Sequence, residues 1–133
     1  MKFKQIFIPI TIVAFLCSAI LVAYLSNYVF PWQYQESIKA TLAMGGLSSL
    51  PDYAEDIEIE KRGSPFTRQF IIEFRSTPIE IEKWIKNSKR LKTNKPRIVG
   101  ETKVYEILPG ENGAAGGRVE VTGNKVLINM SWS

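Results

Sequence analysis

The chain has 133 residues, 17 basic and 13 acidic side chains, a formal net charge of +4, and no histidine. Because histidine is the commonest general base and metal ligand, and Cys17 is the only thiol, catalytic Ser-His and Cys-His pairs and zinc sites are excluded. We therefore expect no enzymatic activity, no metal and no cofactor, and a single cysteine allows no disulfide within the chain.

The N-terminal part predicts a membrane anchor. Lys2 and Lys4 precede residues 6–25 (IFIPITIVAFLCSAILVAYL), which as a helix at about 1.5 Å per residue span the roughly 30 Å hydrocarbon layer. We assign residues 1–4 to a cytoplasmic N-terminus and 5–27 to a single-pass transmembrane signal-anchor helix. Basic residues precede the span, and the next charges after it cancel, so we expect the rest of the chain outside the cytoplasm.

Two alternatives compete with an uncleaved anchor. A cleaved signal peptide usually has an apolar region of about 7–15 residues, shorter than this one, and Leu21 is too bulky for the nearest cleavage site, before Tyr24. Cleavage nevertheless stays open. A lipoprotein signal would end at Cys17, but Leu16 stands where a small residue is required. We interpret Cys17 as a small hydrophobe within the membrane helix.

Residues 28–54 predict a juxtamembrane helix and linker. Residues 33–44 have helical composition and a modest apolar stripe, and Gly45 and Gly46 stop this helix. Aromatic residues crowd the outer end of the span, which is typical of an interfacial belt, although packing against a folded domain is an alternative for some of them. They are Tyr24, Tyr28, Phe30, Trp32 and Tyr34.

The most informative stretch runs from Phe66 to Leu91, within a predicted extracytoplasmic domain of residues 55–133. Residues 66–75 alternate apolar and polar side chains, which predicts a half-buried strand. Thr77 and Glu80 then form a capping box around Pro78, and the apolar period changes to that of a helix over 77–91. Its buried face contains Ile81, Trp84, Ile85, Ser88 and Leu91, and its exposed face pairs Glu82 with Lys86.

The remaining strands are predicted from alternation and turns. A first strand surrounds Ile57 and Ile59, residues 97–100 form a short extended piece, and 103–108 form a strand. After a loop over 109–117 with four glycines, 118–122 and 125–133 pair through a turn at Gly123 and Asn124. The prediction is an α+β fold, an antiparallel sheet of about five strands with one helix on one face. Its expected core is Phe70, Ile72, Phe74, Ile81, Trp84, Ile85, Val126, Ile128 and Trp132.

Three candidate sites have ordinary structural explanations. Glu58, Glu60 and Glu73 occupy outward strand positions, where solvated carboxylates are usual, so we do not assign them to acid–base catalysis. The acidic cluster around Asp52 and Asp56 lacks the spacing of a calcium-binding loop. The glycines at 110, 113, 116 and 117 lack the Gly-Lys-Ser/Thr ending of a phosphate loop and precede a strand.

The basic segment is the one surface that predicts a partner. Residues 83–103 carry eight basic side chains against Glu101 alone. A solvated helix face explains much of this charge. The alternative is contact with an anionic partner, either lipid headgroups, a cell-envelope polymer or an acidic envelope protein, whereas nucleic acid is not expected outside the cytoplasm. The predicted surface consists of Lys83, Lys86, Lys89, Arg90, Lys92, Lys95 and Arg97.

These features favour a membrane-anchored, extracytoplasmic binding or assembly module without enzymatic activity. The alternative is an inhibitor or immunity-type protein that acts on an envelope partner, and a histidine-free enzyme is the weakest reading. The arrangement of an N-terminal anchor and a small sheet-and-helix domain resembles that of many small single-pass bacterial envelope proteins. This resemblance is architectural, and it carries over no functional residue.

Overall fold

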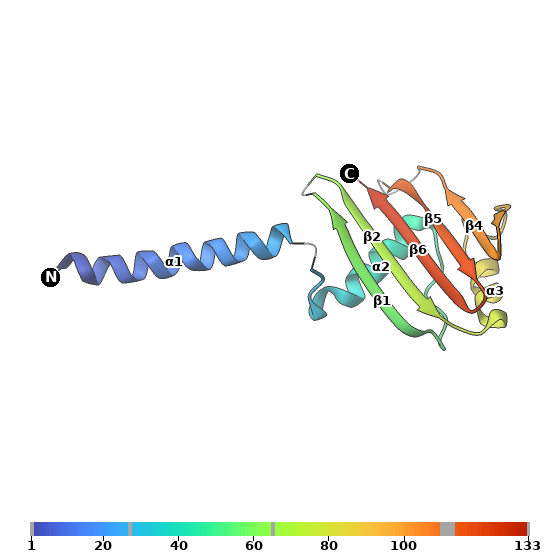
Figure 1. The fold of residues 1–133 in the computed structure, drawn as a ribbon, viewed down its shortest axis with the longest axis horizontal. Coiled ribbons are helices and arrows are strands. Elements are labelled where there is room, and N and C mark those ends of the chain that lie inside the picture. Colours follow the sequence, from blue (N-terminus) through green and yellow to red (C-terminus); the bar gives the residue numbers. More distant parts are fainter. Residues whose placement is uncertain (1, 27, 65, 110–113, 133) are drawn as a thin grey trace.

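A long helix precedes a mixed sheet-and-helix domain in the computed structural model, which describes residues 2–26, 28–64, 66–109 and 114–132 (Figure 1). The helical elements are α1 (Lys2–Leu25), the 3₁₀ turn η1 (Pro31–Gln33), α2 (Tyr34–Gly45) and α3 (Pro78–Asn87). The strands are β1 (Glu55–Gly63), β2 (Arg68–Arg75), β3 (Arg97–Val99), β4 (Thr102–Ile107), β5 (Ala114–Thr122) and β6 (Lys125–Trp132). Helices α2 and α3 both lie on one face of the sheet (Figure 1).

Helix α1 is long and apolar enough to cross a membrane, and it is the one such helix among the described residues. None of its 24 residues is buried against the domain. Pro9 lies inside the helix, and Thr11 and Ser18 donate their hydroxyl hydrogens to carbonyl oxygens one turn earlier. The hydroxyls of Thr11 and Ser18 are therefore satisfied within the helix itself, as an apolar environment requires.

The sheet has six antiparallel strands in the order β1-β2-β6-β5-β4-β3, one more than the five or so predicted. The additional strand is β3, which pairs with β4 in the register Arg97↔Val104. All three β3 residues are exposed, so they show no burial alternation. β5 begins at Ala114, so the predicted loop is shorter than 109–117; Gly110 and Gly113 lie outside the described residues.

Gly117 shows why part of the glycine-rich stretch belongs to the sheet. A Cβ atom at this position would stand 2.1 Å from the carbonyl oxygen of Asn129 and 2.6 Å from the sulfur of Met130. Gly117 pairs with Met130 of β6, and the Met130 side chain is fully buried. The absence of a side chain thus lets β5 and β6 approach closely around a core methionine.

Helix α3 confirms most of the predicted details. The Thr77 hydroxyl accepts a hydrogen bond of 3.3 Å from the Glu80 backbone N–H, and Pro78 occupies the first turn. Lys86 Nζ lies 3.3 Å from Glu82 Oε1, the expected i,i+4 pair. The helix ends at Asn87 rather than at residue 91, because Ser88 is extended and its N–H closes the last turn on the carbonyl oxygens of residues 84 and 85.

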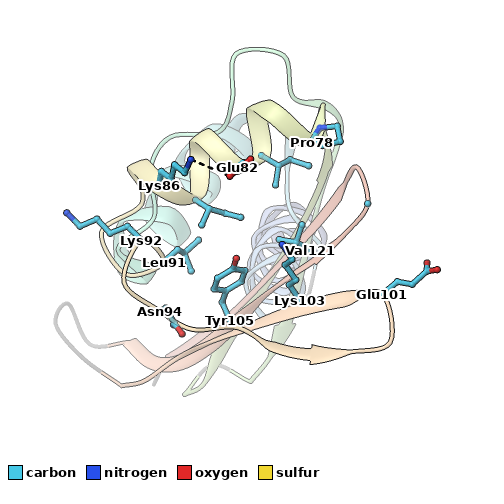
Figure 2. Close-up of a pocket in the computed structure, with 13 residues that line it drawn as sticks. Pro78, Glu82, Lys86, Leu91, Lys92, Asn94, Glu101, Lys103, Tyr105 and Val121 are labelled. Carbon is cyan, nitrogen blue, oxygen red and sulfur yellow. Dashed lines mark ion pairs between the residues drawn. The ribbon is translucent and has the colours of Figure 1, made fainter.

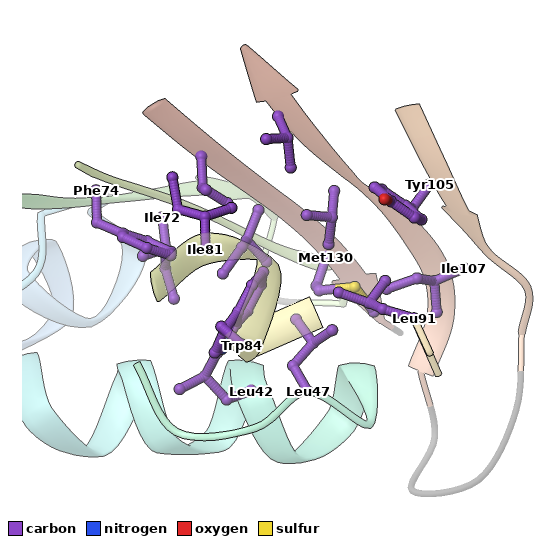
Figure 3. Packing of buried hydrophobic residues seen from close by; sticks show 14 of the residues in the cluster. Leu42, Leu47, Ile72, Phe74, Ile81, Trp84, Leu91, Tyr105, Ile107 and Met130 are labelled. Carbon is purple, nitrogen blue, oxygen red and sulfur yellow. The ribbon is translucent and has the colours of Figure 1, made fainter. Parts of the chain in front are cut away.

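The core lies between the sheet and the two helices (Figure 3). Trp84 of α3 is 2% exposed, and its ring makes an edge contact with Phe74 at a centroid distance of 5.6 Å. The predicted core residues are buried, except that Ile85 and Trp132 are half-buried. Helix α2 adds Ile38 and Leu42, so this segment of the predicted 28–54 linker contributes to the same core.

We expect Trp84→Ala to destabilise the domain strongly. Truncating a buried tryptophan costs about 3–5 kcal/mol, which for a domain of this size lowers the melting temperature by more than about 10 °C. Thermal unfolding of the full chain in detergent, followed by near-UV circular dichroism, measures the change. Trp32→Ala is the matched control, because Trp32 is 75% exposed. Equal melting temperatures for the two variants would contradict the assigned burial of Trp84.

Candidate binding groove

The structure divides the predicted basic surface into three groups. Lys83, Lys89 and Lys95 are exposed, and none of them forms an ion pair with another described residue. Lys86 and Lys92 lie along a groove between α3 and the sheet. Arg90 and Arg97 have structural partners, described next.

Both arginines of the segment fasten it to the rest of the domain. The Arg90 backbone N–H donates to the Gly46 carbonyl oxygen at 3.2 Å, and its guanidinium donates to the Leu108 carbonyl oxygen at 2.9 Å. Arg97 Nη2 lies 3.3 Å from Glu106 Oε1 across the β3–β4 pair. Since the Arg90 side chain is bonded to Leu108 and the Arg97 side chain to Glu106, these two guanidinium groups are less available to a partner than the lysines are.

The groove has a volume of about 530 Å³, within the roughly 300–1,000 Å³ usual for ligand sites. One wall comes from α3, one from the segment after it, and the opposite side from β4, β5 and the turn before β6 (Figure 2). The lining residues are Pro78, Ile81, Glu82, Ile85, Lys86, Leu91, Lys92, Asn94, Glu101, Lys103, Tyr105, Val121 and Gly123.

Sheet register sets the strand side of the groove. Lys103 of β4 pairs with Val121 of β5, and Tyr105 pairs with Val119, so these four residues share the helix-facing side of the sheet. Lys103 is exposed whereas Tyr105 is buried, because the core ends between them. The groove is therefore the place where the core opens to solvent, and its floor is apolar.

Asn94 closes one end of the groove. Its side-chain amide donates to the Glu106 carbonyl oxygen at 2.7 Å, which ties the segment after α3 to β4. The C-terminal end of α3 is held separately, by a hydrogen bond of 3.0 Å from Trp84 Nε1 to the Ser48 carbonyl oxygen. These two hydrogen bonds attach α3 to the loop before β1, and the segment after α3 to β4, so they hold the two walls of the groove against the rest of the domain.

The Tyr105 hydroxyl is the polar group at the centre of the groove. Tyr105 is 6% exposed, its hydroxyl points toward α3 (Figure 2), and it makes no hydrogen bond with another described residue. Burial, and then the negative charge of Glu82, raise the pKa of Tyr105 above its ordinary value. The hydroxyl is thus neutral at physiological pH and has an O–H to donate to a ligand.

Three lysines, Lys86, Lys92 and Lys103, line the same groove as this hydroxyl, and the Lys92 ammonium points outward in Figure 2. Lys92 and Lys103 have no ion pair among the described residues, while Lys86 is paired with Glu82 on the α3 side. Glu101 lies at the rim, and its carboxylate points away from the groove (Figure 2). Three lysines over an apolar floor, with a hydroxyl donor that is accessible from the groove, make a site suited to an anionic group that carries an apolar neighbour.

Sequence reasoning missed two residues of this site. Lys103 was counted within the basic segment but not assigned to the predicted surface, and Tyr105 was not singled out. The signal was present: in the strand 103–108, Lys103 and Tyr105 fall on the same face as Ile107, so two side chains with polar ends occupy core-facing positions. A polar group on a buried strand face indicates either a hydrogen-bond partner or a site.

The other candidate residues lie away from the groove. Glu60 and Glu73 are on the side of the sheet that no helix covers. Glu60 forms an ion pair with Arg62 at 2.7 Å, and Glu73 forms one with Lys125 at 3.0 Å. In the acidic cluster, Asp56 lies 4.0 Å from Arg75. Among the described residues there is no group of three or more side chains suited to hold a metal ion.

Comparisons of the chain with protein-family models, with curated proteins and with solved structures found no match.

We expect the stability of the domain to fall as pH rises above about 10, the ordinary pKa of tyrosine. The folded-state pKa values of Tyr105 and Tyr34 are raised, so the unfolded chain releases protons first and is favoured as pH increases. The pKa of Lys61 is lowered, first by burial and then by the charge of Arg68, so its contribution to the stability of the domain increases as pH rises. Urea unfolding of the full chain at pH 8 and pH 10.5 measures the net change.

The contribution of Tyr105 to this loss of stability at high pH is isolated by substitution. Tyr105→Phe removes one of the two raised tyrosines, so the loss of stability between the two pH values should become smaller. Tyr53→Phe is the control, because Tyr53 is exposed and lies outside the groove lining, and it should retain the full loss. An unchanged loss in Tyr105→Phe would contradict the raised pKa.

Proposed function

We propose that this chain is a membrane-anchored binding or assembly module, with α1 in the cell membrane, the N-terminus in the cytoplasm and the domain outside. The apolar helix α1 supports the anchor, and Lys2 and Lys4 in its first turn, before the apolar stretch, support the orientation. The groove between α3 and β4 is the proposed binding site.

The observation that carries the proposal is the combination of the unpartnered Tyr105 hydroxyl with Lys86, Lys92 and Lys103 around an apolar floor. A carboxylate placed near Tyr105 would accept its hydrogen bond and be attracted by the lysines, while an adjacent apolar side chain covers Ile85 and Val121. An acidic segment of a protein, with apolar residues among its carboxylates, has this chemistry.

The position of the groove favours a protein over lipid headgroups. The groove lies where β4 begins and β5 ends, whereas the chain enters the domain beside the end of β1 and the beginning of β2. β2 has eight residues, so at about 3.3 Å per residue these two ends of the sheet are roughly 25 Å apart. Figure 1 shows α1 and α3 at opposite ends of the sheet.

Binding without catalysis is the proposed activity. The chain has no histidine, and Cys17 lies in α1, far from the groove. The groove offers lysines, a tyrosine whose pKa is raised, and carboxylates that are either paired or directed outward. Such a set provides hydrogen bonds and charge for recognition, but it contains neither a histidine to act as general base nor a cysteine to act as nucleophile.

We predict that reversing the groove charge abolishes capture of the partner. A photo-crosslinking amino acid at Ile85, on the α3 wall of the groove, should form a distinct adduct in native membranes. The triple variant Lys86→Glu, Lys92→Glu, Lys103→Glu should reduce this adduct roughly 10-fold to 100-fold, because each reversal replaces an attraction by a repulsion. Immunoblotting and mass spectrometry measure and identify the adduct.

Two matched controls accompany this experiment. Lys83→Glu, Lys89→Glu, Lys95→Glu makes the same change of net charge outside the groove lining and should leave the adduct intact. A cross-linker at Leu127, on the opposite side of the sheet, should not form it. A groove reversal that leaves the adduct unchanged, or the same adduct from both positions, would refute the proposed site.

The proposed topology has its own test. Protease added to intact spheroplasts should digest the domain while a cytoplasmic control protein survives, because the domain lies outside the membrane. N-terminal sequencing of the membrane-bound protein should recover the beginning of α1. Protection of the domain until the membrane is opened, or a mature protein that begins near Tyr24, would be incompatible with an uncleaved anchor of this orientation.

A further inference from the structure

A second basic surface lies at the other end of the sheet, where β1 ends and β2 begins. Lys61 and Arg68 occupy helix-facing positions there, since Lys61 pairs with Phe70, and Arg68 pairs with Gly63 and Trp132. Both line a hollow of about 390 Å³ between the strands and the beginning of α2. This pair of cations was not part of the basic surface predicted from sequence.

The two cations are close and lack a compensating carboxylate. Burial, and then the charge of Arg68, lower the pKa of Lys61, and neither side chain forms an ion pair with another described residue. Glu36 lines the same hollow but does not pair with them. Two neighbouring positive charges repel, and an anion between them relieves that repulsion.

Exposed aromatic side chains flank this basic pair. Phe66, in the connection between β1 and β2, is 85% exposed, and Trp32 of η1 is exposed beside the hollow. Trp32 stacks on Phe30 at a centroid distance of 4.6 Å. Large aromatic residues next to cations are the composition found where proteins meet membrane headgroups.

The end of α1 lies at this same surface. The Arg68 guanidinium carbon is 5.7 Å from the centre of the Tyr24 ring, and Tyr24, Leu25 and Ser26 share a small hollow with residues 61–64. If α1 spans the bilayer, its last turn lies at the depth of the headgroups, and the β1–β2 connection is held beside it (Figure 1).

We propose that the β1–β2 end of the sheet docks on anionic phospholipid headgroups of the leaflet from which α1 emerges. Lys61 and Arg68 bind the headgroup phosphates, and Phe66 and Trp32 enter the interface between headgroups and acyl chains. This inference rests on the proposed function only in that α1 is a membrane anchor. Docking fixes the orientation of the domain, with the α3 groove turned away from the bilayer.

The tether makes this docking efficient. Each cation near an anionic surface favours the docked state by roughly fivefold, and α1 converts docking into an event within one molecule. The attraction decays over a Debye length of about 8 Å at physiological salt, so it acts on residues at the surface and not on the distant groove.

The test places a fluorescent label at either end of the sheet in the full chain. In a Cys17→Ser background, Phe66→Cys or Ile98→Cys is labelled with an environment-sensitive dye, and the protein is placed in nanodiscs with or without phosphatidylglycerol. Ile98 is the matched site, because it is 62% exposed and belongs to the strand paired with the beginning of β4. Lipids with spin-labelled headgroups report proximity by quenching the dye.

We expect strong quenching at position 66 in anionic discs, less in zwitterionic discs and none at position 98. Raising the salt concentration should lower quenching at position 66 without any substitution. The variant Lys61→Glu, Arg68→Glu should reduce the docked-to-free ratio at least about 25-fold, by fivefold for each cation. Lys83→Glu, Lys89→Glu, with the same change of charge, should leave the quenching unaltered.

Two results would overturn the inference in distinguishable ways. A chain that does not stay with the discs overturns the anchor, and docking with it. A chain that stays, but whose label at position 66 is unquenched in anionic discs or insensitive to salt, overturns docking alone. Melting temperatures of the reversed variants, measured in parallel, separate lost docking from lost folding.

Discussion

The position of α3 depends on one buried tryptophan. Trp84 packs between sheet and helices, and its indole N–H donates to the Ser48 carbonyl oxygen, while the Ser48 N–H donates to the Ser88 hydroxyl at 2.9 Å. An indole N–H buried without an acceptor would lower the stability of the fold by about 1–3 kcal/mol. Packing and hydrogen bonding therefore favour the same orientation of the Trp84 side chain. The loop before β1 thereby sets the distance between α3 and β4, and the groove is the space between these two elements.

Much of the fold follows from local patterns in the sequence. The alternation through Ile72 and Phe74, the cap at Thr77 and the turn at Gly123 each specify a local structure that tertiary contacts reinforce. The third strand was not predictable in this way, because Ile98 and its neighbours are exposed at the edge of the sheet and no burial pattern marks them. These residues form a strand only because they pair with β4, which is a tertiary contact.

The candidate site was less predictable than the fold, for a geometric reason. A run of lysines and arginines indicates positive charge, but it does not specify which side chains converge. Lys92 reaches the groove while Arg90, two residues earlier, fastens backbone segments together. Lys103 and Tyr105 join from a strand whose position depends on pairing with β5. Sequence therefore indicated the charge of the site, and only the strand register supplied its central hydroxyl.

The strand order also constrains how the domain forms. β6 follows the other strands in sequence, yet it lies between β2 and β5, and within the described sheet it joins the β1–β2 hairpin to the β3–β4–β5 group. Neither group can pair with β6 until residues 125–132 have been synthesised. The complete sheet can therefore form only once residues 125–132 are available, and until then its two half-sheets expose unpaired edges that favour aggregation.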